Sequence, residues 1–248
     1  MSNLYFSPKH FLTAACICGA MILPVSSTMA GTGEPATAVS TNDLVAGMTY
    51  GDWGAAWWQW AVSIPIEDNP LSGSEGTDCS EGQGSSPVFF LGGTFGDEDE
   101  VVETPVIVDV SRECAVPAGS YLFFPIINAL THNADEPFAE AAQREDVASL
   151  VTSFVDVDSL KVTVDGKKIQ GAKNLIDFRA QSPNFTFTLP ENNVISDNSG
   201  RFDGTADGYW MMLKPLSLGE HEVRFAGNVV VEGEVVFGLD ITYMLTVE

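Results

Sequence analysis

The chain has 248 residues, of which 34 are acidic and 11 are lysine or arginine, so its formal net charge is −23. This charge argues against DNA, RNA and other phosphate-rich partners, which bind basic surfaces. The same acidity suits a protein that stays in solution where salt screens its self-repulsion.

The first thirty residues predict a secretory signal peptide. Lys9 and His10 supply its positive start, and residues 11–25 form an apolar stretch that is too short to span a membrane. Small residues suited to cleavage follow in Thr28-Met29-Ala30. We therefore expect residues 31–248 to form a single exported domain without a membrane span, either secreted or periplasmic.

Removal of the signal peptide takes Cys16 and Cys18 with it and leaves Cys79 and Cys114. An oxidising compartment favours a disulfide between these two, with two free thiols as the alternative. A lipid-attachment site at Cys16 is disfavoured, because too little apolar sequence precedes it.

Apolar residues recur at helical spacing over residues 42–64, after a small, polar stretch at 31–41 that predicts a mobile arm. Thr49 or Asp52 is available as the N-cap, and Pro65 ends the helix. One predicted face carries Trp53, Trp57, Trp60, Ala61 and Ile64.

Short buried strands are predicted next, at residues 87–92, 105–110 and 121–127. Helical periodicity returns over residues 136–154, with Pro137 in the first turn. The inward stripe of this second helix is predicted to be Phe138, Ala142, Val147, Leu150 and Phe154.

The C-terminal third has the clearest β pattern. Residues 160–164 alternate and lead into Asp165-Gly166, a hairpin signal, and further alternating strands follow at 185–189, 220–225 and 235–247. Such strands bury one face against a second sheet. The predicted fold class is mainly β: an antiparallel β-sandwich, jelly-roll or immunoglobulin-like, with two helical insertions.

Four of the five tryptophans lie in the motif Trp53-x3-Trp57-Trp58-Gln59-Trp60. On a helix Trp58 projects about 100° away from Trp57, so these rings cannot all face one core, and we expect at least one at a surface or groove. Packing of the helix over an open end of the sandwich is the alternative. The candidate ligand-binding residues are Asp52, Trp57, Trp58, Gln59, Gln83, Arg112 and Trp210.

A second cluster could carry acid/base chemistry. His132 is expected in a polar loop after the strand at 121–127, where Asp135 or Asp207 could act with it. A solvated loop is the alternative. His221 shares the parity of Val223 and Phe225 in its strand, which predicts a packed core residue.

No cofactor is predicted. The acidic residues 97–100, or Asp156 with Asp158, give a weak possibility of Ca²⁺ binding. A zinc set is not expected if Cys79 and Cys114 are bridged. The sequence contains no G-x-S-x-G, H-E-x-x-H or Walker motif.

An ordered set of motifs covers most of the presumed mature chain. The set comprises the tryptophan motif, Asn69-Pro70, Cys79 with Gly82-Gln83-Gly84, Val88-Phe89-Phe90-Leu91-Gly92-Gly93, Arg112-x-Cys114-x2-Pro117-x-Gly119, Phe124-Pro125-Ile126-Ile127-Asn128, Ala206-Asp207-Gly208-Tyr209-Trp210 and Pro215-Leu216-Ser217-x-Gly219-Glu220-His221. It resembles a family of exported bacterial proteins of uncharacterised activity. The resemblance implies export and paired cysteines, but no mechanism.

Three functions follow as hypotheses. The leading one is an exported binding protein for a carbohydrate or other small ligand, held near the tryptophan helix and a loop from Asp207 to Trp210. The second is a secreted hydrolase or lyase that uses His132 with a carboxylate. The third is a structural or envelope interaction protein.

Overall fold

A computed structural model describes residues 34–72, 79–94, 106–135, 138 and 140–248. The predicted signal peptide and the acidic residues 97–100 lie outside this part of the chain. Within it the fold is mainly β, with two α-helices and two sheets, as the sequence predicts. No helix of the described part is long and apolar enough to cross a bilayer.

The helices are α1 (Tyr50–Ser63), α2 (Ala141–Thr152) and a short 3₁₀ helix, η1 (Leu175–Phe178). The strands are β1 (Val88–Phe90), β2 (Val106–Val116), β3 (Tyr121–His132), β4 (Val155–Val164), β5 (Lys167–Lys168), β6 (Arg179–Gln181), β7 (Phe185–Leu189), β8 (Gly200–Leu213), β9 (Gly219–Val231) and β10 (Glu234–Val247).

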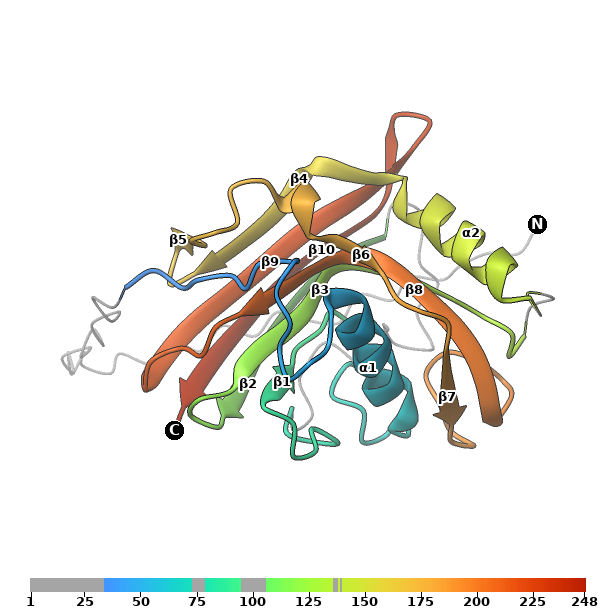
Figure 1. The fold of residues 1–248 in the computed structure, drawn as a ribbon, viewed down its shortest axis with the longest axis horizontal. Coiled ribbons are helices and arrows are strands. Elements are labelled where there is room, and N and C mark those ends of the chain that lie inside the picture. The colour runs from blue at the N-terminus through green and yellow to red at the C-terminus, as the bar shows by residue number, and fades with distance from the viewer. Residues whose placement is uncertain (1–33, 73–78, 95–105, 136–137, 139) are drawn as a thin grey trace, which may run out of the picture.

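The strands form two five-stranded sheets (Figure 1). The β8 sheet has the order β1-β3-β8-β6, with β7 also paired to β8, and the β10 sheet has the order β2-β10-β9-β4-β5. Pairing is antiparallel except that β1 runs parallel to β3 and β2 runs parallel to β10. Successive strands β1, β2 and β3 alternate between the two sheets, so β1 and β3 are joined by a crossover rather than a hairpin.

Neighbouring side chains of β3 show that the β8 sheet lies between α1 and the β10 sheet. Phe123 contacts Tyr50 and Trp53 of α1, whereas Phe124 stacks on Phe225 of β9 with ring centroids 4.7 Å apart. Side chains alternate across a strand, so each face of β3 serves a different interface. Helix α1 therefore covers a sheet face, and does not cap an open end of the sandwich.

Helix α1 begins where a capping box can form. Thr49 accepts a hydrogen bond from the backbone N–H of Asp52, and the carboxylate of Asp52 accepts one from the backbone N–H of Thr49. These reciprocal bonds satisfy donors that an open helix end would leave unpaired. The helix ends at Ser63, before Pro65, as predicted.

The predicted inward stripe of α2 is wrong. The buried residues are Arg144, Ala148 and Thr152, while Leu150 is 57% exposed and Phe154, just beyond the helix, is 41% exposed. The buried face is selected by polar contacts: the Arg144 guanidinium donates to Asn184 Oδ1, and Thr152 donates to the carbonyl of Asp207. Apolar periodicity cannot detect a face that is buried through hydrogen bonds.

Two segments expected to be irregular belong to the sandwich. Residues from Asp207 to Trp210 lie in the central strand β8 rather than in a loop, and Ala206 and Trp210 are fully buried. The start of the described chain is also fixed, because Val39 donates to the carbonyl of Met212 and Lys214 donates to that of Thr37. Residues 37–39 are therefore not a mobile arm.

Candidate functional site

All four tryptophans of α1 are buried, because the helix lies over a face of the β8 sheet. Trp53 donates its indole N–H to the carbonyl of Val45, and Trp57 donates to that of Leu91 at 2.7 Å. Trp57 and Trp58 meet edge to face, with ring centroids 5.1 Å apart. All four rings belong to one buried core, contrary to the expectation that they could not share one. Trp57 and Trp58 also line a pocket.

This pocket, called here the tryptophan pocket, has a volume of about 190 Å³. It lies between α1, the segment after β1, the middle of β3 and the start of β10. Its walls are formed by Trp57, Trp58, Leu71, Gly93, Thr94, Pro125, Ile126, Ile127, Asn128, Phe237 and Leu239. Aromatic and aliphatic side chains thus provide most of the lining.

Asn128 is the amide-bearing residue in this lining. Its Nδ2 is buried, and no acceptor for it exists within the described part of the chain. Register places Asn128 opposite Gly208 of β8, where a Cβ on residue 208 would lie 2.5 Å from the Asn128 Cβ. Gly208 therefore makes room for Asn128, and the amide is a donor held beside apolar walls.

Two adjacent glycines lie beside residues of the pocket wall. A Cβ on Gly92 would lie 2.7 Å from the Trp57 ring, whereas a Cβ on Gly93 would meet only Leu239, at 3.8 Å. Gly92 is held from the other sheet, because the Tyr243 hydroxyl donates to its carbonyl and accepts from its N–H. The pocket wall is thus tied to β10.

Arg112, a predicted ligand residue, packs against Tyr243, which holds this wall of the pocket. It is 2% exposed, and its guanidinium carbon lies 5.8 Å from the centre of the Tyr243 ring. Burial raises the pKa of Tyr243, while the nearby Arg112 charge opposes that rise. Arg112 therefore acts through Tyr243 and does not line the pocket.

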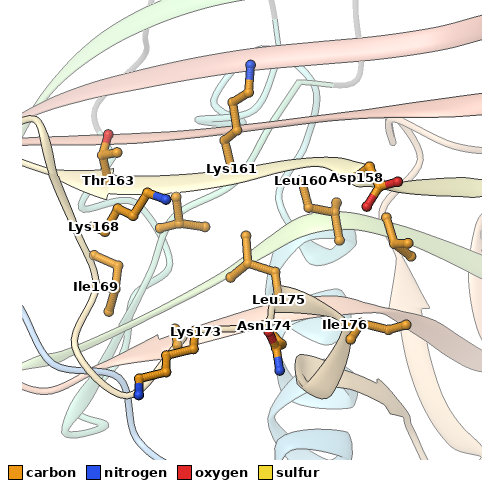
Figure 2. Close-up of a pocket in the computed structure, with 13 residues that line it drawn as sticks. Asp158, Leu160, Lys161, Thr163, Lys168, Ile169, Lys173, Asn174, Leu175 and Ile176 are labelled. Carbon is orange, nitrogen blue, oxygen red and sulfur yellow. The ribbon is translucent and has the colours of Figure 1, made fainter.

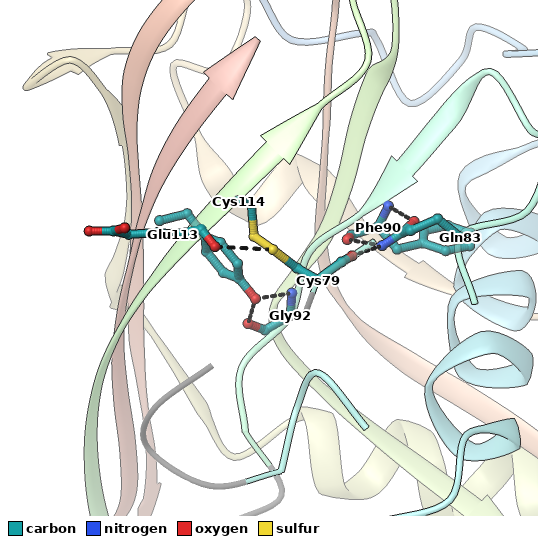
Figure 3. The surroundings of a disulfide bond; sticks show 7 residues. Cys79, Gln83, Phe90, Gly92, Glu113 and Cys114 are labelled. Carbon is teal, nitrogen blue, oxygen red and sulfur yellow. Dashed lines mark hydrogen bonds between the residues drawn. A yellow bond between two sulfur atoms is a disulfide. The ribbon is translucent and has the colours of Figure 1, made fainter. Parts of the chain in front are cut away.

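Gln83, another predicted ligand residue, fixes the loop beside the disulfide (Figure 3). Its side chain donates to the carbonyls of Cys79 and Phe90 and accepts from the backbone N–H of Phe90. The predicted Cys79–Cys114 disulfide is present, with Cα atoms 5.8 Å apart. Both features connect the segment 79–94 to the sheets. The side-chain amide of Gln83 is engaged by backbone groups.

The other predicted ligand residues lie away from the pocket. Asp52 caps α1, where hydrogen bonds from Thr49 hold its pKa below the usual value. Gln59 is exposed and donates to the carbonyl of Thr186. Trp210 is fully buried under α1 and stacks on Phe123. Trp210 also contacts Trp57, with ring centroids 6.0 Å apart, but of the predicted set only Trp57 and Trp58 line the pocket.

Two of the predicted acid/base residues, His132 and Asp135, lie close enough that the His132 charge helps to lower the pKa of Asp135. His132 is the last residue of β3, not part of a loop, and its Nδ1 accepts from the backbone N–H of Ala134. Asp135 accepts hydrogen bonds from Ser196 and Asn198; the bond from Ser196 is the main reason that its pKa is lowered. A catalytic role for His132 stays a prediction.

Asp207 forms an ion pair with Arg179 and does not pair with an acid/base residue. It is 3% exposed and receives two hydrogen bonds from the Arg179 guanidinium, at 3.1 and 2.9 Å. These bonds raise the pKa of Arg179. The Arg179 side chain also donates to Ser149 of α2, so the pair attaches α2 to β8. The position of Asp207 favours a structural role.

The described residues contain no group of three His, Cys, Asp or Glu side chains placed to hold a metal ion. Of the two weak Ca²⁺ candidates, residues 97–100 lie outside the described chain. Asp156 uses Oδ1 to accept from the backbone N–H of Asp158. Such a hydrogen bond, donated to a carboxylate by the backbone N–H two residues later, is common in turns that begin at aspartate.

A larger recess, about 640 Å³, runs along β4 beside η1 (Figure 2). Its floor includes Leu160 and Leu175, and three lysines border it: Lys161, Lys168 and Lys173. All three lysines are exposed, and Figure 2 shows Lys161 and Lys173 pointing away from one another. The recess is an open surface groove that no pattern in the sequence indicates.

Comparison with known proteins gives no match to a protein-family model and none to a curated protein. Three solved structures have low similarity. Amebosin has a TM-score of 0.20 and 10% identity, over 58% of this chain and 99% of its own. The cysteine protease inhibitor EhICP2 from Entamoeba histolytica has a TM-score of 0.19 and 12% identity, over 65% and 96%. PbICP-C, solved in complex with falcipain-2, has a TM-score of 0.21 and 9% identity, over 64% and 98%. TM-scores this low do not indicate a shared fold.

Proposed function

We propose that the protein is an exported binding protein that takes a small, mostly apolar molecule with a hydrogen-bond acceptor into the tryptophan pocket. The observation that carries this proposal is the buried Asn128 amide beside Trp57 and Trp58, with no acceptor for Nδ2 among the described residues. Export rests on the N-terminal sequence, and the Cys79–Cys114 disulfide is compatible with it.

The size of the pocket restricts the ligand. Its volume of about 190 Å³ is below the range of about 300–1,000 Å³ that holds drug-sized ligands. A cavity of about 150 Å³ in another protein holds one benzene ring. The tryptophan pocket therefore suits a single ring or a short branched chain, and an oligosaccharide could place only one residue in it.

The chemistry of the lining sets the second requirement. Transfer of an apolar ring from water to aromatic and aliphatic walls is favourable, and flat faces such as those of Trp57 and Trp58 suit a ring. A buried amide donor without an acceptor costs about 1–3 kcal/mol. A ligand carbonyl or ether oxygen at Asn128 would remove that cost, so a ring with one oxygen acceptor fits better than a plain hydrocarbon.

The test compares two probes that differ in one acceptor. Binding of cyclohexanone and cyclohexane is measured by calorimetry with the purified protein and with Asn128→Leu, which removes the amide at similar volume. We expect the wild-type protein to bind the ketone about ten-fold more tightly, equivalent to roughly 1.4 kcal/mol. Asn128→Leu is expected to remove this preference.

Gln59→Ala is the matched control, since Gln59 lies on the same helix but outside the pocket. It should bind both probes as the wild-type protein does. The proposal is wrong if neither probe binds, or if Asn128→Leu retains the full preference for the ketone.

A further inference from the structure

A second recess lies beside the turn between β4 and β5 and is called here the hairpin pocket. Its volume is about 480 Å³. The segment that follows β8 forms one side, and the start of the described chain forms another. Its lining includes Asp165, Lys167, Lys214, Ser217 and His221.

Three side chains of this pocket form a hydrogen-bonded series. The Ser217 hydroxyl lies 3.1 Å from His221 Nε2, and His221 Nδ1 lies 2.9 Å from Asp165 Oδ2. Ser217 is exposed, whereas the side chains of His221 and Asp165 are 9% and 18% exposed. This order of groups matches a nucleophilic site: the accessible hydroxyl is the nucleophile, the largely buried imidazole is the base, and the partly buried carboxylate orients the imidazole.

The carboxylate is fixed in place by the strands. Asp165 has a φ of +51° in the hairpin turn, and its backbone N–H donates to the carbonyl of Glu222 on β9. Its Oδ1 in turn accepts from the backbone N–H of Glu222, which leaves Oδ2 for the imidazole. A carboxylate at Nδ1 selects the tautomer with its proton on Nδ1, so Nε2 carries the lone pair that faces Ser217.

Both protonation states of the ring have a partner at Nε2. The neutral ring accepts from the Ser217 hydroxyl, and after protonation Nε2 can donate to the Ser217 carbonyl, which lies 3.0 Å away. The expected apolar packing of His221 is therefore only half correct. The ring is buried, as its parity predicts, but its two nitrogens contact polar groups.

We propose that Ser217, His221 and Asp165 form a nucleophilic site that hydrolyses small carboxylic esters. Such sites are identified by the geometry and roles of the three groups and recur on unrelated folds, so the absence of a G-x-S-x-G motif does not argue against this one. Lys167 and Lys214 line the same pocket, and their positive charge would favour an oxyanion formed there.

The reaction needs only the ester and water. Ser217 Oγ forms a bond to the ester carbonyl carbon as its proton passes to His221 Nε2, and the bond to the leaving alcohol then breaks as that proton moves to the alcohol oxygen. Water attacks the acyl-serine in the same way, with its proton taken by Nε2 and returned to Oγ. The products are one alcohol and one carboxylic acid.

The test is covalent labelling of the purified protein with a fluorophosphonate probe, followed by intact mass and peptide mapping. We expect one adduct, on Ser217, and none with Ser217→Ala. His221→Gln and Asp165→Asn should label at least 100-fold more slowly, within the range of about 10²–10⁴ that a general base contributes. Release of p-nitrophenolate from p-nitrophenyl acetate should follow the same order.

Ser111→Ala is the matched control, because Ser111 is exposed on β2 and outside the hairpin pocket. It should label as the wild-type protein does. The inference is overturned if the wild-type protein gains no adduct, if the adduct is on another residue, or if a folded His221→Gln protein labels at the wild-type rate. Ser217→Ala removes an exposed hydroxyl and keeps the test valid if a His221 variant fails to fold. This site is independent of the tryptophan pocket.

Discussion

The hydroxyl of Tyr243 binds both backbone groups of Gly92, donating to the carbonyl at 2.9 Å and accepting from the N–H at 3.2 Å. These two bonds connect β10 to the segment that forms one wall of the tryptophan pocket (Figure 3). Tyr243→Phe leaves both groups of Gly92 buried without this partner. We expect a loss of about 2 kcal/mol in the free energy of unfolding, measured by urea denaturation. Tyr121→Phe is the control, and an equal loss there would contradict the explanation.

The same tyrosine predicts a response to alkaline pH. Burial raises the pKa of Tyr243 above its ordinary value of 10.0, so the folded protein keeps the proton that the unfolded chain releases. Stability from this group is complete below the ordinary pKa and falls as pH rises above it. Between pH 8 and 11, the unfolding free energy of Tyr243→Phe should fall less steeply than that of the wild-type protein. Parallel curves would contradict the assignment.

Adjacent glycines at the pocket wall should respond differently to the same change. Gly92→Ala places a Cβ 2.7 Å from the Trp57 ring and should destabilise the fold by about 1–3 kcal/mol through overpacking. Gly93→Ala meets only Leu239 at 3.8 Å, so the melting temperature should stay close to the wild-type value while the pocket becomes smaller. Weaker cyclohexanone binding by Gly93→Ala, seen by calorimetry, is the expected result. Unchanged binding would place the ligand elsewhere.

On α2, replacing a charged residue should cost more stability than replacing a hydrophobic one, because the buried face of this helix is polar. Arg144→Ala removes a 2% exposed guanidinium that donates to Asn184 and to the carbonyl of Phe138, and should cost about 3 kcal/mol. Leu150→Ala changes an exposed side chain and should cost below about 0.5 kcal/mol. Chemical denaturation of both variants checks this order. A larger loss of unfolding free energy for Leu150→Ala would show that the apolar stripe is the buried face.

The capping box of α1 gives a prediction for acid. Hydrogen bonds from Thr49 lower the pKa of Asp52, so its stabilising effect is complete above its unfolded pKa and is lost as pH falls through the folded value. Asp52→Ala should cost about 1 kcal/mol at pH 7, and the difference from the wild-type protein should shrink below about pH 4. Asp68→Ala, an exposed carboxylate outside the cap, is the control in denaturation at both pH values.

Local patterns predicted the parts of the fold that depend on local chemistry. The hairpin turn at Asp165-Gly166, the end of α1 before Pro65 and the alternating strands β7 and β10 all occur where the sequence places them. Each follows from backbone preference or from a period of two, which a single sequence displays. The Cys79–Cys114 pairing follows from the cysteine count.

Strand β8 was missed because tertiary packing determines its composition. It includes Gly208, which is required where the side chain of Asn128 approaches, and Asp207, which is buried with Arg179. Both residues break an apolar alternation and resemble a loop in sequence. The stripe of α2 was wrong for a related reason, since its buried face is polar.

The candidate site was half predictable. The angle between Trp57 and Trp58 on a helix predicted that the rings could not all face one core, but both are buried in the same core. They also line the pocket. In the sequence Asn128 is only the end of an apolar motif, and its importance depends on burial of the amide nitrogen opposite Gly208. That burial comes from the register between β3 and β8, which is set by long-range pairing.

The most direct test of ligand binding at the tryptophan pocket is NMR titration of the ¹⁵N-labelled protein with cyclohexanone, following the five indole N–H signals. Trp58→Phe assigns one of them. We expect the signals of Trp57 and Trp58 to shift with a common saturation curve, and those of Trp53 and Trp60, which do not line the pocket, to stay in place. If the Trp57 and Trp58 signals do not move, or if all five move together without saturation, the protein does not bind its ligand there.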